Sequence, residues 1–211
     1  MPGVLIAAFE PFGGESINAS WEAVRVLGGT DRVETLCLPC AYRRSAELLR
    51  AALERVRPGA LLLVGQAAGR AEVCVERVAI NLDDAELADN DGDIRFDQPI
   101  IPSGPPAYFA GVGVRDLVRN LALAGIAARV SHSAGAYVCN HAFYSASHAV
   151  AASGTATQVG LVHVPVTPAQ AERHPGSPTM PTETVVRALA LIINHVLAPG
   201  SPAAMAAIAS P

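Results

Sequence analysis

Short apolar runs alternate with helical patterns along most of the chain, and this alternation limits the possible fold more than any other feature. Apolar runs predict strands at 4–8, 33–38, 60–64, 127–131 and 158–164. Helical patterns predict helices at 19–27, 45–57, 114–124, 139–152 and 182–197. The helix expected over 45–57 has one apolar face, formed by Leu48, Leu49, Ala52, Leu53 and Val56.

A repeated strand-helix pattern favours a parallel sheet with helices on both of its faces. The run at 60–64 is continuously apolar, which is typical of a strand covered on both sides. A chain of 211 residues lies within the size of a single core, which extends to about 250 residues. We therefore expect an α/β fold: a single-domain, three-layer α/β/α sandwich with a mainly parallel twisted sheet over 1–198. A flexible tail rich in Pro, Ala and Ser is expected over 199–211.

The middle of the chain has a different pattern. Residues 73–81 alternate with period two, which predicts one strand that carries Glu76 among apolar neighbours. The following segment, 83–97, contains seven acidic residues and one Arg, and Pro99, Pro102, Pro105 and Pro106 come after it. We expect this region to be a long loop, placed as a lid.

Lysine is absent, because all 15 basic residues are Arg. This excludes Schiff-base catalysis, pyridoxal phosphate attachment and a Walker-type phosphate loop. The net charge of −4 and the scattered arginines give no basic stripe, so nucleic acid is not an expected partner.

Only 16% of the residues are charged, against roughly 25% in typical soluble proteins, which favours a homo-oligomer whose subunits cover one another. No apolar stretch approaches the 18 or so residues of a membrane span, and no signal segment is evident. We expect no membrane contact and a cytoplasmic location. The four cysteines are then free thiols rather than a disulfide scaffold.

Cys139 is the first candidate for chemistry, because a strand and a Gly-containing turn lead to it at the start of a helix. Amides and the macrodipole at a helix start favour a thiolate, so we expect a lowered thiol pKa and a site for an oxyanion. A buried packing cysteine is an equally open interpretation.

A nucleophilic thiol needs a base, and the chain has six histidines. His163 is the preferred base because it closes the strand over 158–164, at a carboxyl end. His141 is expected to point away from Cys139, and a core role for His163 stays possible. Glu76, an acid on an apolar strand face, must be paired. It either orients a histidine or forms an ion pair with Arg70 or Arg77.

Three further signals are weak. Cys37 and Cys40 have the spacing of a dithiol redox motif. The acidic run at 89–93 departs from the calcium-loop pattern, and the Gly pair at 111 and 113 does not follow a strand. No second closely spaced cysteine pair completes a structural zinc site, and we expect no metal.

Several segments together resemble the pyrrolidone carboxyl peptidases (pyroglutamyl peptidase type I), cysteine peptidases that remove N-terminal pyroglutamate. The likeness spans nearly the whole chain. Its markers are Phe9-Glu-Pro-Phe-Gly-Gly14 with Asn18 and Trp21, Gly65-Gln-Ala-Ala68, Glu76-Arg-Val-Ala-Ile-Asn81, Ser133-Ala-Gly-Ala-Tyr-Val-Cys139-Asn-His141, and Val162-His163-Val-Pro165.

The resemblance implies one α/β/α domain, no cofactor, a tetramer, and N-terminally pyroglutamylated peptides as substrates. It implies Cys139 as nucleophile, His163 as base and later acid, and Glu76 as the orienting carboxylate. It also implies a lactam pocket with four walls, Phe9, Phe12, Tyr137 and Val138. Asn18 and Gln66 are the expected polar partners of the lactam.

Two positions depart from the family pattern. Cys74 stands where Ser or Thr is usual, and Glu86 stands where the family often has Arg. Two other functions therefore stay open: a thiol redox protein acting through Cys37 and Cys40, and a silent binding protein disabled by Glu86. A nucleoside phosphorylase on a similar fold is less favoured, because no Arg-rich phosphate cradle is present.

Overall fold

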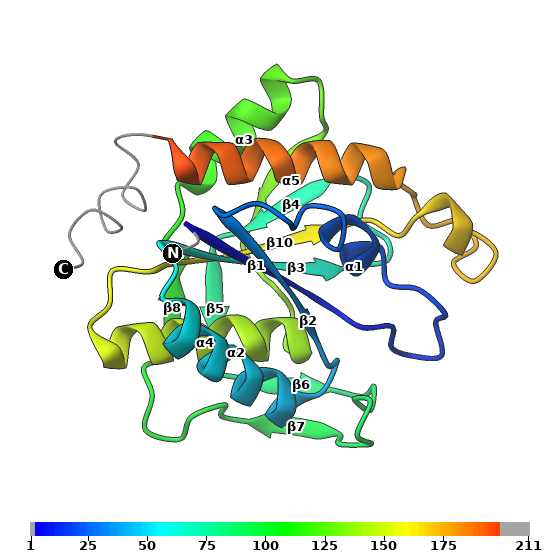
Figure 1. The fold of residues 1–211 in the computed structure, drawn as a ribbon. Coiled ribbons are helices and arrows are strands. Elements are labelled where there is room, and N and C mark those ends of the chain that lie inside the picture. Colours follow the sequence, from blue (N-terminus) through cyan, green and yellow to red (C-terminus); the bar gives the residue numbers. More distant parts are fainter. Residues whose placement is uncertain (1–2, 199–211) are drawn as a thin grey trace.

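The central sheet has six strands in the order β2-β1-β3-β10-β4-β9 (Figure 1). In the computed structural model, which describes residues 3–198, every neighbouring pair is parallel except β10 and β4. The strands are β2 Val33–Leu38, β1 Val4–Phe9, β3 Ala60–Gln66, β10 Gln158–Val164, β4 Val73–Glu76 and β9 Ala128–Ser131. The prediction of a mainly parallel sheet is confirmed.

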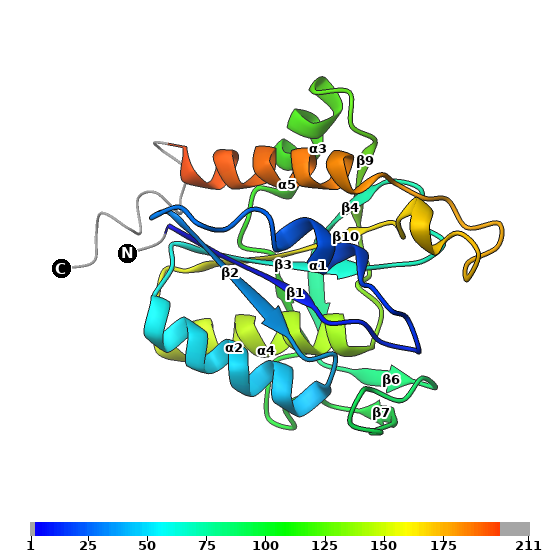
Figure 2. The ribbon, with the colours of Figure 1, turned by 45° about the vertical axis from the view of Figure 1, so that its right-hand side comes forward.

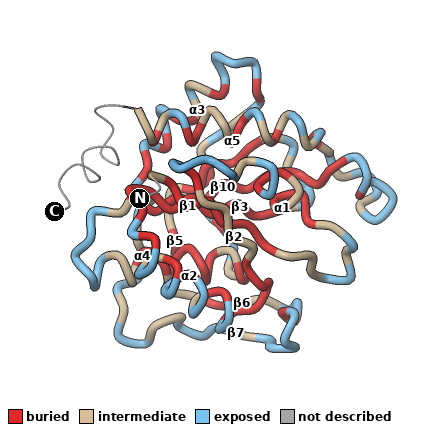
Figure 3. The backbone as a smooth tube through the Cα atoms, in the orientation of Figure 1, coloured by how far each residue is buried: buried red, intermediate tan, exposed pale blue. Residues whose placement is uncertain are grey.

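Helices cover both faces of this sheet (Figures 1 and 2). One face carries α1 Ala19–Val24, α3 Val114–Leu123 and α5 Thr182–Leu197, and the other carries α2 Tyr42–Val56 and α4 Val138–Ser153. Alternate residues of β1 serve the two layers: Val4 and Ile6 belong to one apolar cluster, Leu5 and Ala7 to the other. The inner strands β1, β3 and β10 are accordingly buried along their length, as Figure 3 shows. The three-layer α/β/α prediction is confirmed, while 199–211 lies outside the described residues.

Helix α2 begins at Tyr42, three residues before its predicted start. Its N-cap residue, Ala41, has no capping side chain. The amide of Tyr42 instead donates to Asp89 Oδ2 at 2.9 Å, from a segment 47 positions away in the sequence. A cap supplied from so far along the chain leaves no local signal, which is why the sequence missed this boundary.

The single strand predicted over 73–81 is wrong. Strand β4 ends at Glu76, and β5 Val78–Ile80 pairs with β8 Ala107–Phe109 in a separate two-stranded sheet. The chain leaves the main sheet at Arg77, whose amide donates to Ser131 O and whose carbonyl accepts from Ala110. Glu76 is therefore the last residue of its strand in the main sheet.

The loop predicted over 83–97 is also corrected, because it forms a hairpin. Strands β6 Asp83–Ala85 and β7 Arg95–Gln98 pair antiparallel, on the outer side of α2 and α4 (Figure 2). Its acidic residues are held by specific donors: Asp83 pairs with Arg95, and Asp89 Oδ1 accepts from the amides of Asp91 and Asp93. The density of acidic residues therefore suggested a loop, although the segment forms an ordered hairpin.

No helix among the described residues is long and apolar enough to cross a membrane.

Candidate active site

Cys139 lies in the first turn of α4, directly after Val138. The preceding segment leaves β9 at Ser131 and reaches the helix through Gly135, whose φ of +77° is favourable only for glycine. The half-buried thiol faces a pocket at the carboxyl ends of the parallel strands. The predicted position at a helix start is confirmed.

His163 and Glu76 are paired inside the protein. His163 Nδ1 lies 2.8 Å from Glu76 Oε1, and their side chains are 4% and 0% exposed. In the antiparallel β10–β4 ladder His163 is opposite Cys74, so Glu76, two residues further along, is a diagonal neighbour on the same face. A carboxylate only accepts hydrogen bonds, so Nδ1 carries the proton and Nε2 is the free acceptor.

Gly65 brings the imidazole and the thiol together. It is the direct partner of His163 across the β3–β10 ladder. A Cβ at Gly65 would lie 3.0 Å from His163 Nε2 and 2.8 Å from Cys139 Sγ. Both reacting atoms therefore converge on the space that the missing side chain leaves, and sequence reasoning did not identify this role.

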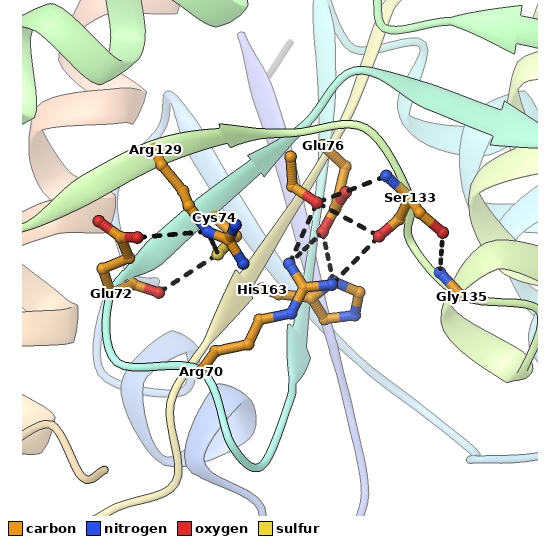
Figure 4. Close-up of polar contacts among 9 residues, drawn as sticks. Arg70, Glu72, Cys74, Glu76, Arg129, Ser133, Gly135 and His163 are labelled. Carbon is orange, nitrogen blue, oxygen red and sulfur yellow. Dashed lines mark hydrogen bonds and ion pairs between the residues drawn. The ribbon is translucent and has the colours of Figure 1, made fainter.

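Glu76 has a second partner besides His163. It therefore makes both of the contacts that the sequence left open, one with a histidine and one with an arginine. Arg70 donates to the same oxygen, Oε1, over 2.7 Å (Figure 4). Arg77, the other cation considered, makes no recorded contact with Glu76, and its buried NH2 has no hydrogen-bond partner. The carboxylate thus orients a histidine and binds a cation at the same time.

The environment shifts the pKa values of Glu76 and Cys139 in opposite directions. Burial by itself raises the pKa of Glu76, but the hydrogen bond from His163 and the charge of Arg70 outweigh it, so this pKa is lowered. Burial raises the pKa of the Cys139 thiol, and the charges of Cys40 and Glu76 add to the effect. The predicted lowering of this thiol pKa is therefore wrong, because burial acts in the opposite direction and favours the protonated thiol.

The pocket beside the thiol has a volume of about 190 Å³, small against the roughly 300–1,000 Å³ of drug-sized sites. Among the residues predicted for a binding pocket, those that line it are Phe9, Phe12, Asn18, Gln66 and Tyr137. The rings of Phe12 and Tyr137 lie 6.0 Å apart and form a wall. Val138 does not line it, because its fully buried side chain packs in the core.

The two predicted polar partners differ in what they have left to offer. Asn18 caps α1, accepting from Ser20 N at 3.0 Å, and its Nδ2 donates to Glu10 O, which leaves one Nδ2 hydrogen without a recorded partner in the described chain. Gln66 Oε1 accepts from Ala19 N at 2.7 Å and from the Gln170 side chain. A backbone amide can only donate, which fixes the orientation of the Gln66 amide and leaves its Nε2 without a recorded partner in the described chain.

Cys40 also lines the pocket, although the sequence singled it out only as half of a redox pair. Burial raises the pKa of Cys40 to about 12 and raises that of Cys37 as well. Reactive dithiols usually have a lowered thiol pKa, so the environment of Cys37 and Cys40 gives no support to a redox pair.

Glu86 stands apart from the pocket. It follows β6, is exposed, and has no recorded hydrogen bond or ion pair. Within residues 3–198, no group of three or more His, Cys, Asp or Glu side chains is arranged to hold a metal ion.

Comparison with known proteins gives a consistent result. The family model described as pyroglutamyl peptidase matches residues 3–198. The pyrrolidone-carboxylate peptidase of Pectobacterium carotovorum subsp. carotovorum (strain PC1) is 48% identical over 202 residues, covering 94% of each chain. A second relative, the pyrrolidone-carboxylate peptidase 1 of Ralstonia nicotianae, is 45% identical over 201 residues, covering 93% of this chain and 94% of its own.

Solved structures agree. A variant of pyrrolidone carboxyl peptidase from P. furiosus is similar with a TM-score of 0.89 and 35% identity, over 92% of this chain and 97% of that one. Pyroglutamyl peptidase I from Bacillus amyloliquefaciens has a TM-score of 0.88 and 34% identity, over 92% and 94% of the two chains.

Proposed function

This chain belongs to the pyroglutamyl peptidase family, and we propose that it is a cysteine peptidase that removes N-terminal pyroglutamate from peptides through Cys139, His163 and Glu76. The family model and the relatives are pyroglutamyl or pyrrolidone-carboxylate peptidases, which are hydrolases, so the chain is a peptidase. The observation that carries the catalytic assignment is the convergence of Cys139 Sγ and His163 Nε2 above Gly65.

The pocket matches the chemistry of a pyroglutamyl residue. Its lactam has no charged amine, so aromatic walls such as Phe12 and Tyr137 bury it at no cost in ion desolvation. The free Nε2 of Gln66 supplies a donor for a carbonyl oxygen. A free α-amino group would have to enter this site charged and unpaired, which selects against ordinary N-termini.

The first half of the reaction begins with a protonated thiol, because burial raises the pKa of Cys139. His163 Nε2 takes the thiol proton as sulfur attacks the pyroglutamyl carbonyl carbon. Glu76, kept ionised, stabilises the resulting imidazolium through Nδ1. The backbone amides of the first turn of α4 are available to the oxyanion.

Collapse of the tetrahedral intermediate breaks the amide bond. His163 returns its proton to the leaving nitrogen, the shortened peptide departs, and a thioester to Cys139 remains. Water then attacks the thioester while His163 accepts one of its protons. Breakdown releases pyroglutamate, and the proton returns to sulfur, which restores the starting thiol and imidazole.

The assembly and location of the protein are part of the same proposal. Large apolar side chains remain exposed, with Phe109 78% and Leu123 82% accessible, which supports a homo-oligomer, a tetramer by family resemblance. Four free thiols among the described residues fit a reducing, cytoplasmic compartment. The catalytic unit is assigned to 1–198 as one domain.

The test is release of a fluorescent amine from a pyroglutamyl amide under reducing conditions. Wild type is compared with Cys139→Ala, with a prolyl amide as the substrate control. Turnover confined to the wild type and to the pyroglutamyl amide is expected. A folded wild type without turnover contradicts the proposal and favours a silent binding protein, while full activity of Cys37→Ser, which removes the dithiol without changing the pocket-lining Cys40, excludes the redox alternative.

A further inference from the structure

Arg70 lies in the connection from β3 to β4, at the rim of the pocket. Its side chain is only 19% exposed, although it is the pocket-lining arginine. Neither its position in the sequence nor the triad explains why a cation is held there, but the contacts of its guanidinium group do.

The guanidinium group reaches three separate parts of the site (Figure 4). One nitrogen, NH1, donates to Glu76 Oε1 at 2.7 Å and to Ser131 Oγ at 3.2 Å. The other, NH2, donates to Ser133 O at 3.1 Å. Arg70 therefore joins the acid at the end of β4 to the end of β9 and to the segment that leads into α4.

The acid depends on this arrangement, because its two oxygens are unequal. Glu76 Oε1 serves both His163 and Arg70, while Oε2 is buried without a partner. A buried carboxylate with one neutral donor and an unpaired oxygen is costly to ionise. The Arg70 charge offsets that cost while leaving His163 Nδ1 bound to the same atom.

The segment held by Ser133 O is the one that positions the nucleophile. It runs from Ser131 to Tyr137, contains Gly135 at positive φ, and places Cys139 in the first helical turn. Ser131 Oγ also donates to Ser133 O, so the segment is braced at two points. A shift here moves sulfur relative to His163.

We propose that Arg70 is a positioning residue of the peptidase: its forked guanidinium fixes Glu76 as a carboxylate and locks the 131–137 segment, so that one side chain aligns acid, base and nucleophile. The inference rests on the proposed peptidase function. Lysine carries the charge but has one nitrogen, so it cannot make all of these contacts, whereas glutamine lacks the charge.

The experiment compares Arg70→Lys and Arg70→Gln with wild type on the pyroglutamyl amide. The matched control is Arg119→Gln on α3, because Arg119 is 69% exposed and pairs with Asp116. Readouts are kcat, KM, the pH profile of kcat/KM, the iodoacetamide alkylation rate of Cys139, and urea unfolding.

For Arg70→Gln we expect kcat to fall about tenfold or more with a smaller change in KM, since general acid-base catalysis contributes roughly 10²–10⁴-fold. The acidic limb of its kcat/KM profile should move up by about one pH unit. A nearby Arg lowers a carboxyl pKa by roughly 1–3 units, and this variant removes that effect from Glu76. Arg70→Lys should keep the limb near its wild-type position and still lose kcat, and Arg119→Gln should change neither.

A wild-type pH profile and kcat in folded Arg70→Gln overturn the inference. Full recovery of kcat in Arg70→Lys also overturns the forked-contact part of it. If Arg70→Gln does not fold, Arg70→Lys decides by its kcat and alkylation rate. Failure of the proposed function is separate, because it leaves wild type itself without turnover.

Discussion

Gly65 is the direct neighbour of His163 across the β3–β10 ladder, and its hydrogen faces the same space as Cys139 Sγ. A Cβ there would lie 2.8 Å from the sulfur and from His163 Cδ2, which is closer than real Cβ contacts come. The absence of a side chain at one position of β3 is therefore what allows the base and the nucleophile to meet.

Gly65→Ala should consequently lose about 100-fold in kcat, because displacement of reacting groups by about 1 Å costs that much. The fold should persist, since the strand itself is unaffected. Gly113→Ala is the matched control, because the nearest atom to a Cβ at that glycine is an ordinary 3.6 Å away. Steady-state kinetics together with circular dichroism check the prediction, and unchanged kcat in Gly65→Ala would contradict it.

The sequence predicted the layers well because they depend on periodicity. Strands β2 and β10 and helix α5 match their predicted ranges, since apolar runs and amphipathic faces are local signals. The hairpin β6–β7 was missed for the opposite reason. Its stability comes from distant partners, as when Asp83 binds His141 from α4, and no local pattern records such a contact.

The candidate site likewise contains residues that the sequence identifies and residues that only tertiary contacts reveal. Cys139 and His163 were identified because each is a reactive residue type at an element boundary, and Glu76 because it is an acid on an apolar strand face. Gly65 and Arg70 act through contacts between elements, and Val138 was misplaced because a residue beside a nucleophile can face the core as easily as the pocket. The thiol pKa was misjudged because burial is a tertiary property.

Asn90 should control substrate affinity through the pocket walls. Its side chain donates to Glu10 Oε1 and Pro11 O, each at 2.9 Å, and its amide donates to Cys40 O. Pro11 precedes Phe12, so Asn90 joins two walls of the pocket.

Asn90→Ala should raise KM about tenfold with a smaller effect on kcat, because each lost hydrogen bond is worth roughly 0.5–1.5 kcal/mol and about 1.4 kcal/mol is tenfold. The neighbouring Asp91→Ala is the control: Asp91 is 38% exposed and pairs only with Arg44 in the recorded contacts. Kinetics on the pyroglutamyl amide measure both variants. Equal KM in the two would rule out the role of Asn90.

Glu86, which the sequence singled out as a departure from the family pattern, should have little influence on catalysis. It is exposed and does not line the pocket, so Glu86→Ala and Glu86→Arg should keep kcat/KM within about twofold of wild type, as for surface changes in general. The same amide assay applies. A silent wild type activated by Glu86→Arg would instead support the binding-protein interpretation.

Asp83 should be essential to the stability of the hairpin and its contact with α4. Its 0% exposed carboxylate lies 2.8 Å from both Arg95 NH1 and His141 Nδ1. Asp83→Ala leaves the buried His141 without its carboxylate partner, while Arg95 keeps only its ion pair with Asp93, and should cost about 3 kcal/mol in the free energy of unfolding by urea. Glu47→Ala removes an exposed pair with Arg43 and should cost at most about 0.5 kcal/mol. Similar losses in the two variants would show that the buried cluster does not stabilise the fold.

Acid should destabilise the protein in part through Glu15, which follows the Phe12 loop. Its side chain is 8% exposed, and hydrogen bonds from Gln170, Arg173 and His174 outweigh burial and lower its pKa below the ordinary 4.5. A carboxyl with a depressed folded pKa binds fewer protons when folded. Its contribution is therefore complete above about pH 4.5 and is lost as the pH falls through the folded value.

Glu15→Gln removes this linkage, so its free energy of unfolding should fall less steeply than that of wild type as the pH is lowered below 4.5. Glu172→Gln is the matched control from the same region as His174, because Glu172 is exposed and has no recorded ion pair. Urea unfolding between neutral pH and the acid limit of folding measures the slopes. The remaining slope in Glu15→Gln then belongs to other carboxyls, Glu76 among them, whose pKa is also lowered. A wild-type slope in Glu15→Gln would show that the Glu15 contacts do not persist in solution.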